Sequence, residues 1–195
     1  MWLGTLLEPE VDLHRLTEVL DGLGHEGRVD TIRQWDGRTQ ARLYEAVKGY
    51  MPLTLDFFVP SDLPPKTEVI HWGKNSLAML THFQKRFTRP EEGSDLWGYN
   101  HNVFPASWGG PGFFVVHPDE VEGEIGIDYT KLPSGKLDAW PRIVPNDYLI
   151  SRFVYYDMVD VMRGISTHVS IGRARRHGKW TDNYFVLTRE DPKPS

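Results

Sequence analysis

The sequence predicts an α+β protein in which a short N-terminal helical segment is followed by a mainly antiparallel, strongly curved sheet or β-barrel. Apolar residues recur at three- and four-residue steps mainly before residue 50, which is typical of helices. After residue 66, short runs of β-branched and aromatic residues are separated by turn-forming residues, which is typical of strands. The length of 195 residues suits one domain. We therefore expect a single domain over 1–195, with a helical cap at 1–50 and a β-rich body at 66–190.

Three short helices are expected in the cap. Residues 9–22 place their valines and leucines on one helical face, with a proline near the first turn and a glycine at the end. A second helix should carry Val29 and Ile32, and a third should span 39–48 before a glycine. Residues 51–65 contain prolines near both ends and are expected to form an irregular connection.

The β-rich body begins at residue 66. Its expected strands, each rich in β-branched or aromatic residues, are 68–72, 113–117, 124–129, 152–162, 168–175 and 183–189. Residues 77–87 suit a helix or a strand equally, and residues 89–112, rich in Gly, Pro, Asn and Trp, are expected to form a long loop. An acidic turn at 118–123 and a turn at 177–178 would join neighbouring strands as hairpins. The sheet should therefore be antiparallel.

The last third of the chain carries a family resemblance. Residues 155–157 (YYD), 172–174 (GRA) and 184–187 (YFVL) resemble the closing strands of small bacterial lipocalin-like barrels of unassigned function. The resemblance implies a closed barrel with a cavity for a small, partly apolar molecule. The Gly-x-Trp that lipocalins carry near the N-terminus is missing.

Composition restricts the partners. The net charge of −5 disfavours nucleic acid, because affinity for nucleic acid comes largely from neutralising phosphates. The absence of cysteine excludes disulfides and thiolate chemistry and fits a reducing compartment. The apolar residues 1–7 are too few for a signal peptide, and no run approaches the roughly 20 apolar residues of a membrane helix. We expect a cytoplasmic protein without nucleic-acid or membrane partners, and we leave its oligomeric state open.

The sequence contains no familiar catalytic motif. It has no Gly-x-Ser-x-Gly, no phosphate-binding loop and no His-Glu-x-x-His, so no nucleotide or other cofactor is expected. None of the eight histidines is paired at a His-x-His or His-x₃-His interval. We therefore expect no metal site.

The segment around Asp160 allows two interpretations. Strand alternation would place Tyr156 and Asp160 on one face, and Tyr155 and Asp157 on the other. An aspartate desolvated in a cavity would have a raised pKa and could act as a base. The more ordinary interpretation, which we adopt, is an exposed ion pair between Asp160 and Arg163.

These patterns lead to a functional prediction: a small, partly apolar ligand binds in a β-barrel or curved-sheet pocket lined by aromatic and histidine side chains. The predicted ligand-binding residues are His71, Trp72, His82, Trp97, Tyr99, His101, His117, Tyr156 and His168. His168 is the first to test, because it shares a strand face with the small residues Ser170, Gly172 and Ala174.

Two alternatives stay open at this point. One is a cofactor-independent lyase, isomerase or hydrolase that uses a histidine, Asp128 or Asp157 as base and a tyrosine as acid. The other is a protein-interaction module that docks through the aromatic segment 97–108 or the basic turn near residue 177. A deep cavity would favour ligand binding, whereas a flat aromatic patch would favour a protein partner.

Overall fold

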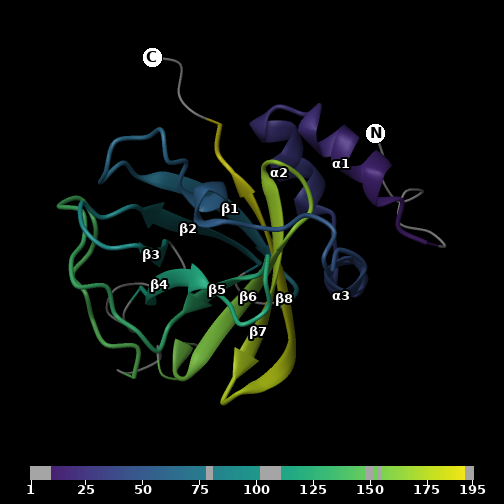
Figure 1. Cartoon of the computed structure of the whole chain (residues 1–195). Coiled ribbons are helices and arrows are strands. Elements are labelled where there is room, and N and C mark those ends of the chain that lie inside the picture. Colours follow the sequence, from purple (N-terminus) through teal and green to yellow (C-terminus); the bar gives the residue numbers. More distant parts are fainter. Residues whose placement is uncertain (1–9, 78–80, 102–110, 148–151, 153–154, 192–195) are drawn as a thin grey trace.

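The computed structural model describes residues 10–77, 81–101, 111–147, 152 and 155–191 (Figure 1). In these ranges the helices are α1 (Leu13–Asp21), α2 (His25–Arg33), α3 (Gly37–Ala46) and the short α4 (Leu55–Phe58). The strands are β1 (Val69–Asn75), β2 (His82–Thr88), β3 (Leu96–His101), β4 (Phe113–Pro118), β5 (Ile125–Asp128), β6 (Met158–Gly164), β7 (Val169–Arg176) and β8 (Lys179–Arg189). The predicted α+β class, with N-terminal helices before the sheet, is confirmed.

The eight strands form a closed antiparallel barrel. Each strand pairs with the next along the chain, and β8 pairs with β1, so that Trp72 lies opposite Thr188. The predicted turn between β7 and β8 is confirmed, with positive φ angles of 50° at His177 and 70° at Gly178. Two consecutive positive φ angles suit the right-handed twist of a two-residue hairpin. The curved sheet expected from the sequence therefore closes on itself.

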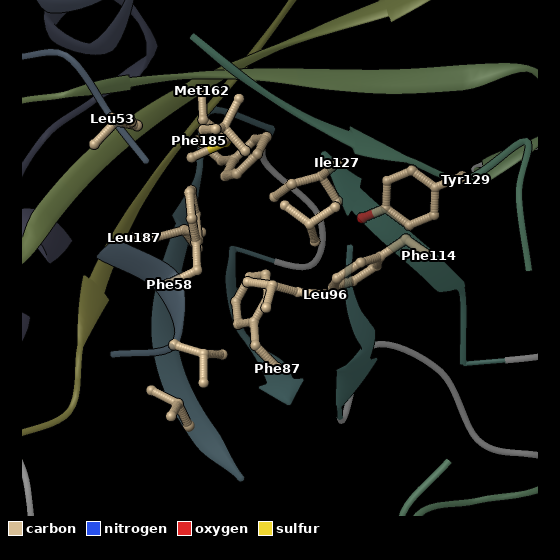
Figure 2. Close-up of a cluster of buried hydrophobic side chains, with 14 of the residues drawn as sticks. Leu53, Phe58, Phe87, Leu96, Phe114, Ile127, Tyr129, Met162, Phe185 and Leu187 are labelled. Carbon is tan, nitrogen blue, oxygen red and sulfur yellow. The ribbon is translucent and has the colours of Figure 1, made fainter. Parts of the chain in front are cut away.

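The barrel encloses one apolar cluster. Inward-facing side chains such as Phe87, Leu96 and Ile127 are fully buried, and Phe58 of α4 joins them (Figure 2). The ring of Phe58 stacks on His71 of β1 at a centroid distance of 5.6 Å. Residues 51–65 were expected to be irregular throughout, but α4 within them packs its apolar side into this end of the barrel.

Helices α1 to α3 lie against the outer face of the barrel, beside β7 and β8 (Figure 1). Asp12 caps α1 by accepting a hydrogen bond from the Arg15 backbone N–H at 3.0 Å, which satisfies a free donor of the first turn. Leu16 and Leu20, one turn apart, are fully buried against outward-facing residues of the closing strands. The amphipathic pattern of the first 50 residues thus predicts both the helices and the face that they bury.

Two predicted boundaries are wrong. Residues 89–112 were expected to be a loop, but 96–101 form β3; residues 102–110 lie outside the described ranges. Gly98 and Asn100, which look like turn formers, are buried inward-facing residues of this strand. The expected strand over 152–162 begins only at Met158, after a turn in which Asp157 has a φ of 51°. The ambiguous segment 77–87 forms β2 from His82 onward.

Candidate functional site

A cavity of about 220 Å³ lies inside the barrel. It is at the end away from α4, since its wall includes the last residue of β1 and the early part of β8, whereas α4 packs near the opposite ends of these strands. Its side chains belong to strands far apart in the sequence. They include Phe83, Lys85, Asn100, Tyr129, Tyr155, Asp160 and Ala174.

A buried ion pair lies in the wall of this cavity. The side chains of Lys85 on β2 and Asp160 on β6 are 3% and 4% exposed, and Lys85 Nζ donates to Asp160 Oδ2 at 3.2 Å. Lys85 Nζ also donates to Asn100 Oδ1 at 3.0 Å and contacts Tyr129 Oη. Asn100 Nδ2 in turn donates to Tyr129 Oη at 3.0 Å. The four side chains form one polar network in the cavity wall.

Aromatic rings surround the lysine. Four ring centroids lie between 4.9 and 5.6 Å from Lys85 Nζ, within the range of cation–π attraction. They belong to Phe83, Phe114, Tyr129 and Phe185. Figure 2 shows Phe114, Tyr129 and Phe185 among the interior side chains.

Glycines on neighbouring strands make room for the phenylalanines of this group. Each phenylalanine lies directly opposite an inward-facing glycine, and a Cβ added to that glycine would lie 2.2 to 2.5 Å from a ring atom. The pairs are Gly73 with Phe83, Gly98 with Phe114, and Gly172 with Phe185. Because real Cβ atoms do not approach rings so closely, any larger residue would push the ring away from its place beside Lys85.

Burial changes the acid–base properties of the pair. Desolvation lowers the pKa of Lys85, and the Asp160 carboxylate opposes this change. Desolvation likewise raises the pKa of Asp160, against the attraction of Lys85. Both pKa values therefore move toward the uncharged forms, which is the usual effect of a low-dielectric interior.

Tyr155 supplies a second polar feature. Its ring is 3% exposed and stacks on Tyr129 at a centroid distance of 5.0 Å. Its Oη is buried and forms no hydrogen bond with the described residues. Burial raises the pKa of Tyr155, with Asp160 adding to the rise and Asn100 opposing it, so the phenol stays protonated and able to donate. A buried donor without a partner is costly.

The predicted ion pair between Asp160 and Arg163 is wrong. Residues three apart on a strand lie on opposite faces, so Asp160 faces the interior while Arg163 faces outward. Arg163 instead donates to Glu124 Oε1 at 2.7 Å and to the Tyr44 backbone carbonyl at 2.8 Å. The other interpretation, a desolvated Asp160 in a cavity wall, is what the structure shows.

The nine predicted ligand-binding residues do not meet at this cavity. His71 faces the interior but lies among Phe58 and Phe87 at the α4 end, where burial lowers its pKa to about 3. Trp72 and His82 are together, in a small surface hollow beside α2. Tyr156 is exposed and lines a surface hollow, two residues before the start of β6.

The remaining predicted residues on β3 and β4 lie on the outer face, and His168 lies just before β7. Tyr99 packs against Trp140 at 4.9 Å, with Trp97 beside this group, and Tyr99 Oη lies 3.1 Å from His101 Nδ1. His117 Nε2 lies 3.3 Å from Asp128 Oδ2, and His168 Nδ1 lies 3.8 Å from Asp191 Oδ1. The structure thus pairs Trp72 with His82 and Tyr99 with His101, but it does not gather the nine into one site. Their role toward a ligand stays a prediction.

One sequence signal could have found Lys85. In residues 83–87 it stands between Phe83 and Phe87 at two-residue spacing, so all three share one strand face. A lysine between two phenylalanines on one face is a candidate for burial.

The small residues on the face expected for His168 do face the barrel interior, and one of them, Ala174, lines the cavity. His168 itself lies before the first residue of β7.

Three further observations complete the description. Among the described residues, no group of three or more His, Asp or Glu side chains could hold a metal ion. Across the same ranges, every helix is too short or too polar to cross a membrane. Comparison with family models, with curated proteins and with solved structures found no match, so the resemblance to lipocalin-like barrels stays a prediction.

Proposed function

We propose that this protein binds a small, partly apolar molecule inside the barrel, with the polar group of the ligand beside Lys85, Asp160 and Tyr155. The observation that supports it best is the Tyr155 hydroxyl, a buried donor beside the cavity that has no hydrogen-bond partner among the described residues. A ligand acceptor would satisfy this hydroxyl. The cavity of about 220 Å³ suits a ligand smaller than the drug-sized molecules held in pockets of roughly 300–1,000 Å³.

The buried ion pair adds support. Replacing such a pair by well-packed apolar residues is often neutral or stabilising, because desolvation of two charges offsets their attraction. A barrel could therefore be built more simply without Lys85 and Asp160. Their location in the wall of a cavity, rather than in the packed end near Phe58, favours a role toward a ligand.

A cofactor-independent enzyme is the second candidate, and one observation favours it: two titratable groups lie within hydrogen-bond reach of each other in the cavity. In this candidate the base is Asp160. Asp128 faces outward, and although burial tends to raise its pKa, hydrogen bonds from Thr130 hold the pKa below its usual value. Asp157 lies at an exposed turn beside His177.

The binding proposal can be tested by filling the cavity. Ala174 lines it and has a small side chain, so Ala174→Trp should occupy the space, while Val121→Trp places the same ring at an exposed position. We expect a small environment-sensitive dye such as anilinonaphthalene sulfonate, or a compound found by native mass spectrometry of unheated protein, to bind the wild type and Val121→Trp but not Ala174→Trp. A folded Ala174→Trp variant with unchanged binding would overturn the proposal; Ala174→Leu serves if the tryptophan prevents folding.

The lipocalin-like resemblance and a cytoplasmic location belong to the same proposal. The resemblance implies an interior ligand, and the absence of cysteine suits a reducing compartment. Binding of nucleic acid is not part of the proposal, in keeping with the net charge of −5.

A further inference from the structure

We propose that Lys85 forms a reversible Schiff base with a small aldehyde or ketone held in the barrel cavity. This inference rests on the proposed function, since it requires the cavity to admit a small molecule. It goes further by naming the chemical class of the ligand and the atom, Lys85 Nζ, to which the ligand becomes bonded.

The location of Lys85 suits this chemistry. Its side chain is 3% exposed, it lines the cavity, and four aromatic rings surround Nζ. An imine hydrolyses readily in water, so a site that excludes bulk water prolongs its lifetime. The rings also offer an apolar surface to the carbon skeleton of a carbonyl compound.

Asp160 can hold the proton that a nucleophilic amine must lose. Only the uncharged amine attacks a carbonyl carbon, and lysines desolvated in apolar pockets are activated in this way. Transfer of one proton from Lys85 Nζ to Asp160 Oδ2, across the hydrogen bond of 3.2 Å, converts the ion pair into an amine and a carboxylic acid. Burial favours this neutral pair on both sides, as the pKa directions of the two groups show.

The reaction balances with these two groups alone. The Nζ lone pair attacks the carbonyl carbon, the C=O π pair moves to oxygen, the Asp160 acid protonates that oxygen, and the carboxylate then takes a proton from nitrogen. This gives a carbinolamine and regenerates the Asp160 acid. The acid next protonates the hydroxyl, which leaves as water while the nitrogen lone pair forms C=N. The products are one water and a protonated iminium ion beside the Asp160 carboxylate, and no oxidant or reductant is consumed.

Tyr155 and Asn100 have supporting roles. The Tyr155 hydroxyl, which has no hydrogen-bond partner in the described ranges, can donate to the carbonyl oxygen, where negative charge develops during attack. Asn100 accepts from Lys85 Nζ at 3.0 Å and donates to Tyr129 Oη, so it positions the amine through its hydrogen bonds. The iminium product retains one N–H, which can donate to the Asp160 carboxylate as the ammonium did.

Reductive trapping tests the inference. The intact protein is incubated with benzaldehyde and sodium cyanoborohydride near pH 7, and benzylated lysines are located by peptide mass spectrometry. Each unit by which the pKa of an amine is lowered raises its uncharged fraction about tenfold. We expect Lys85 to be labelled about tenfold or more faster than the exposed Lys131 in the same sample. Ala174→Trp should abolish labelling of Lys85 and leave that of Lys131 unchanged.

Two further variants make the outcome decisive. Lys85→Met should remove the fast-labelled site, and Lys179→Met, at an exposed position of the β7–β8 hairpin, should retain it. If Lys85→Met fails to fold, the comparison of Lys85 with Lys131 in the wild type still decides. Labelling confined to exposed lysines while the dye still binds in the cavity would overturn the Schiff base and leave the binding proposal standing. Loss of both dye binding and labelling would contradict the proposed function itself.

Discussion

Replacing Tyr155 by phenylalanine removes one oxygen from the cavity wall and keeps the ring that stacks on Tyr129. In most proteins, deletion of a buried hydroxyl is destabilising because a partner loses its hydrogen bond. Here Tyr155 Oη is buried and has no partner among the described residues. The folded protein therefore bears the desolvation cost of this hydroxyl without compensation.

The expected change can be estimated from this geometry. A buried polar group left without a partner costs about 1–3 kcal/mol. Tyr155→Phe removes this cost and should therefore raise the free energy of unfolding by at most about 3 kcal/mol. Tyr129→Phe is the matched control. Its hydroxyl contacts Lys85 Nζ and receives a hydrogen bond from Asn100 at 3.0 Å, so its loss should lower the free energy of unfolding by about 1.5–3 kcal/mol.

Urea unfolding followed by tryptophan fluorescence measures both changes. Tyr155→Phe should move the midpoint upward or leave it in place, whereas Tyr129→Phe should move it downward at an unchanged slope. Dye binding in the cavity should weaken in Tyr155→Phe despite its stability. A downward shift in Tyr155→Phe as large as that in Tyr129→Phe would refute the reasoning, because it would mean that the hydroxyl has a structural partner, with Asn100 the nearest candidate.

Three other predictions concern charge and pH. Asp160→Asn leaves the Lys85 ammonium unpaired and should cost about 3–5 kcal/mol in urea unfolding, whereas the double variant Lys85→Met with Asp160→Leu should recover most of this loss; an equal loss in both would contradict it. The pKa of His71 is about 3 when folded and about 6.5 when unfolded, so the unfolded chain binds more protons between these values. Stability should thus fall by up to about 1.4 kcal/mol per unit as pH drops below about 6.5, and urea midpoints at pH 7 and 5 should show a smaller fall in His71→Leu. Asp191→Asn removes the carboxylate that pairs with the 2% exposed Arg28 side chain. It should lower the melting temperature at pH 7, and the difference from the wild type should shrink only as the pH falls through the pKa of Asp191, which Arg28 holds below its usual value.

The helices and most strands could be predicted because each carries its periodicity within a short segment. Leu16 and Leu20 show one buried helical face, and residues 113–116 show an unbroken apolar run. β3 could not be predicted, because its inward residues Gly98 and Asn100 are typical of turns. A larger residue at position 98 would collide with Phe114 of β4 and with the backbone carbonyl of Arg86 on β2. These neighbours come from other strands, so the sequence around Gly98 alone does not indicate them.

The cavity residues were harder to predict for a related reason. Whether His71 or Trp72 faces the interior depends on the register of β1 with its neighbours β2 and β8, because a shift of one residue would exchange the two faces. Histidines and tryptophans attracted the prediction because their side chains suit binding sites, yet most of them lie on the outer face. Lys85 and Asp160 became a pair through the packing of β2 and β6, which are 75 residues apart at this contact.

The closure of the barrel by β1 and β8 has a consequence for the order in which the chain folds. Trp72 and Thr188 are paired neighbours although most of the chain lies between them. The outer sides of β7 and β8 also supply the surface on which Leu16, Leu20 and Ile32 are buried. During synthesis the helices therefore leave the ribosome long before the strands that cover their apolar faces. Contacts between distant segments form slowly, so the apolar faces of the helices stay exposed to solvent until the β7–β8 hairpin has formed. We expect folding in the range of milliseconds to seconds that is typical of barrels, with helix packing and barrel closure in one late step.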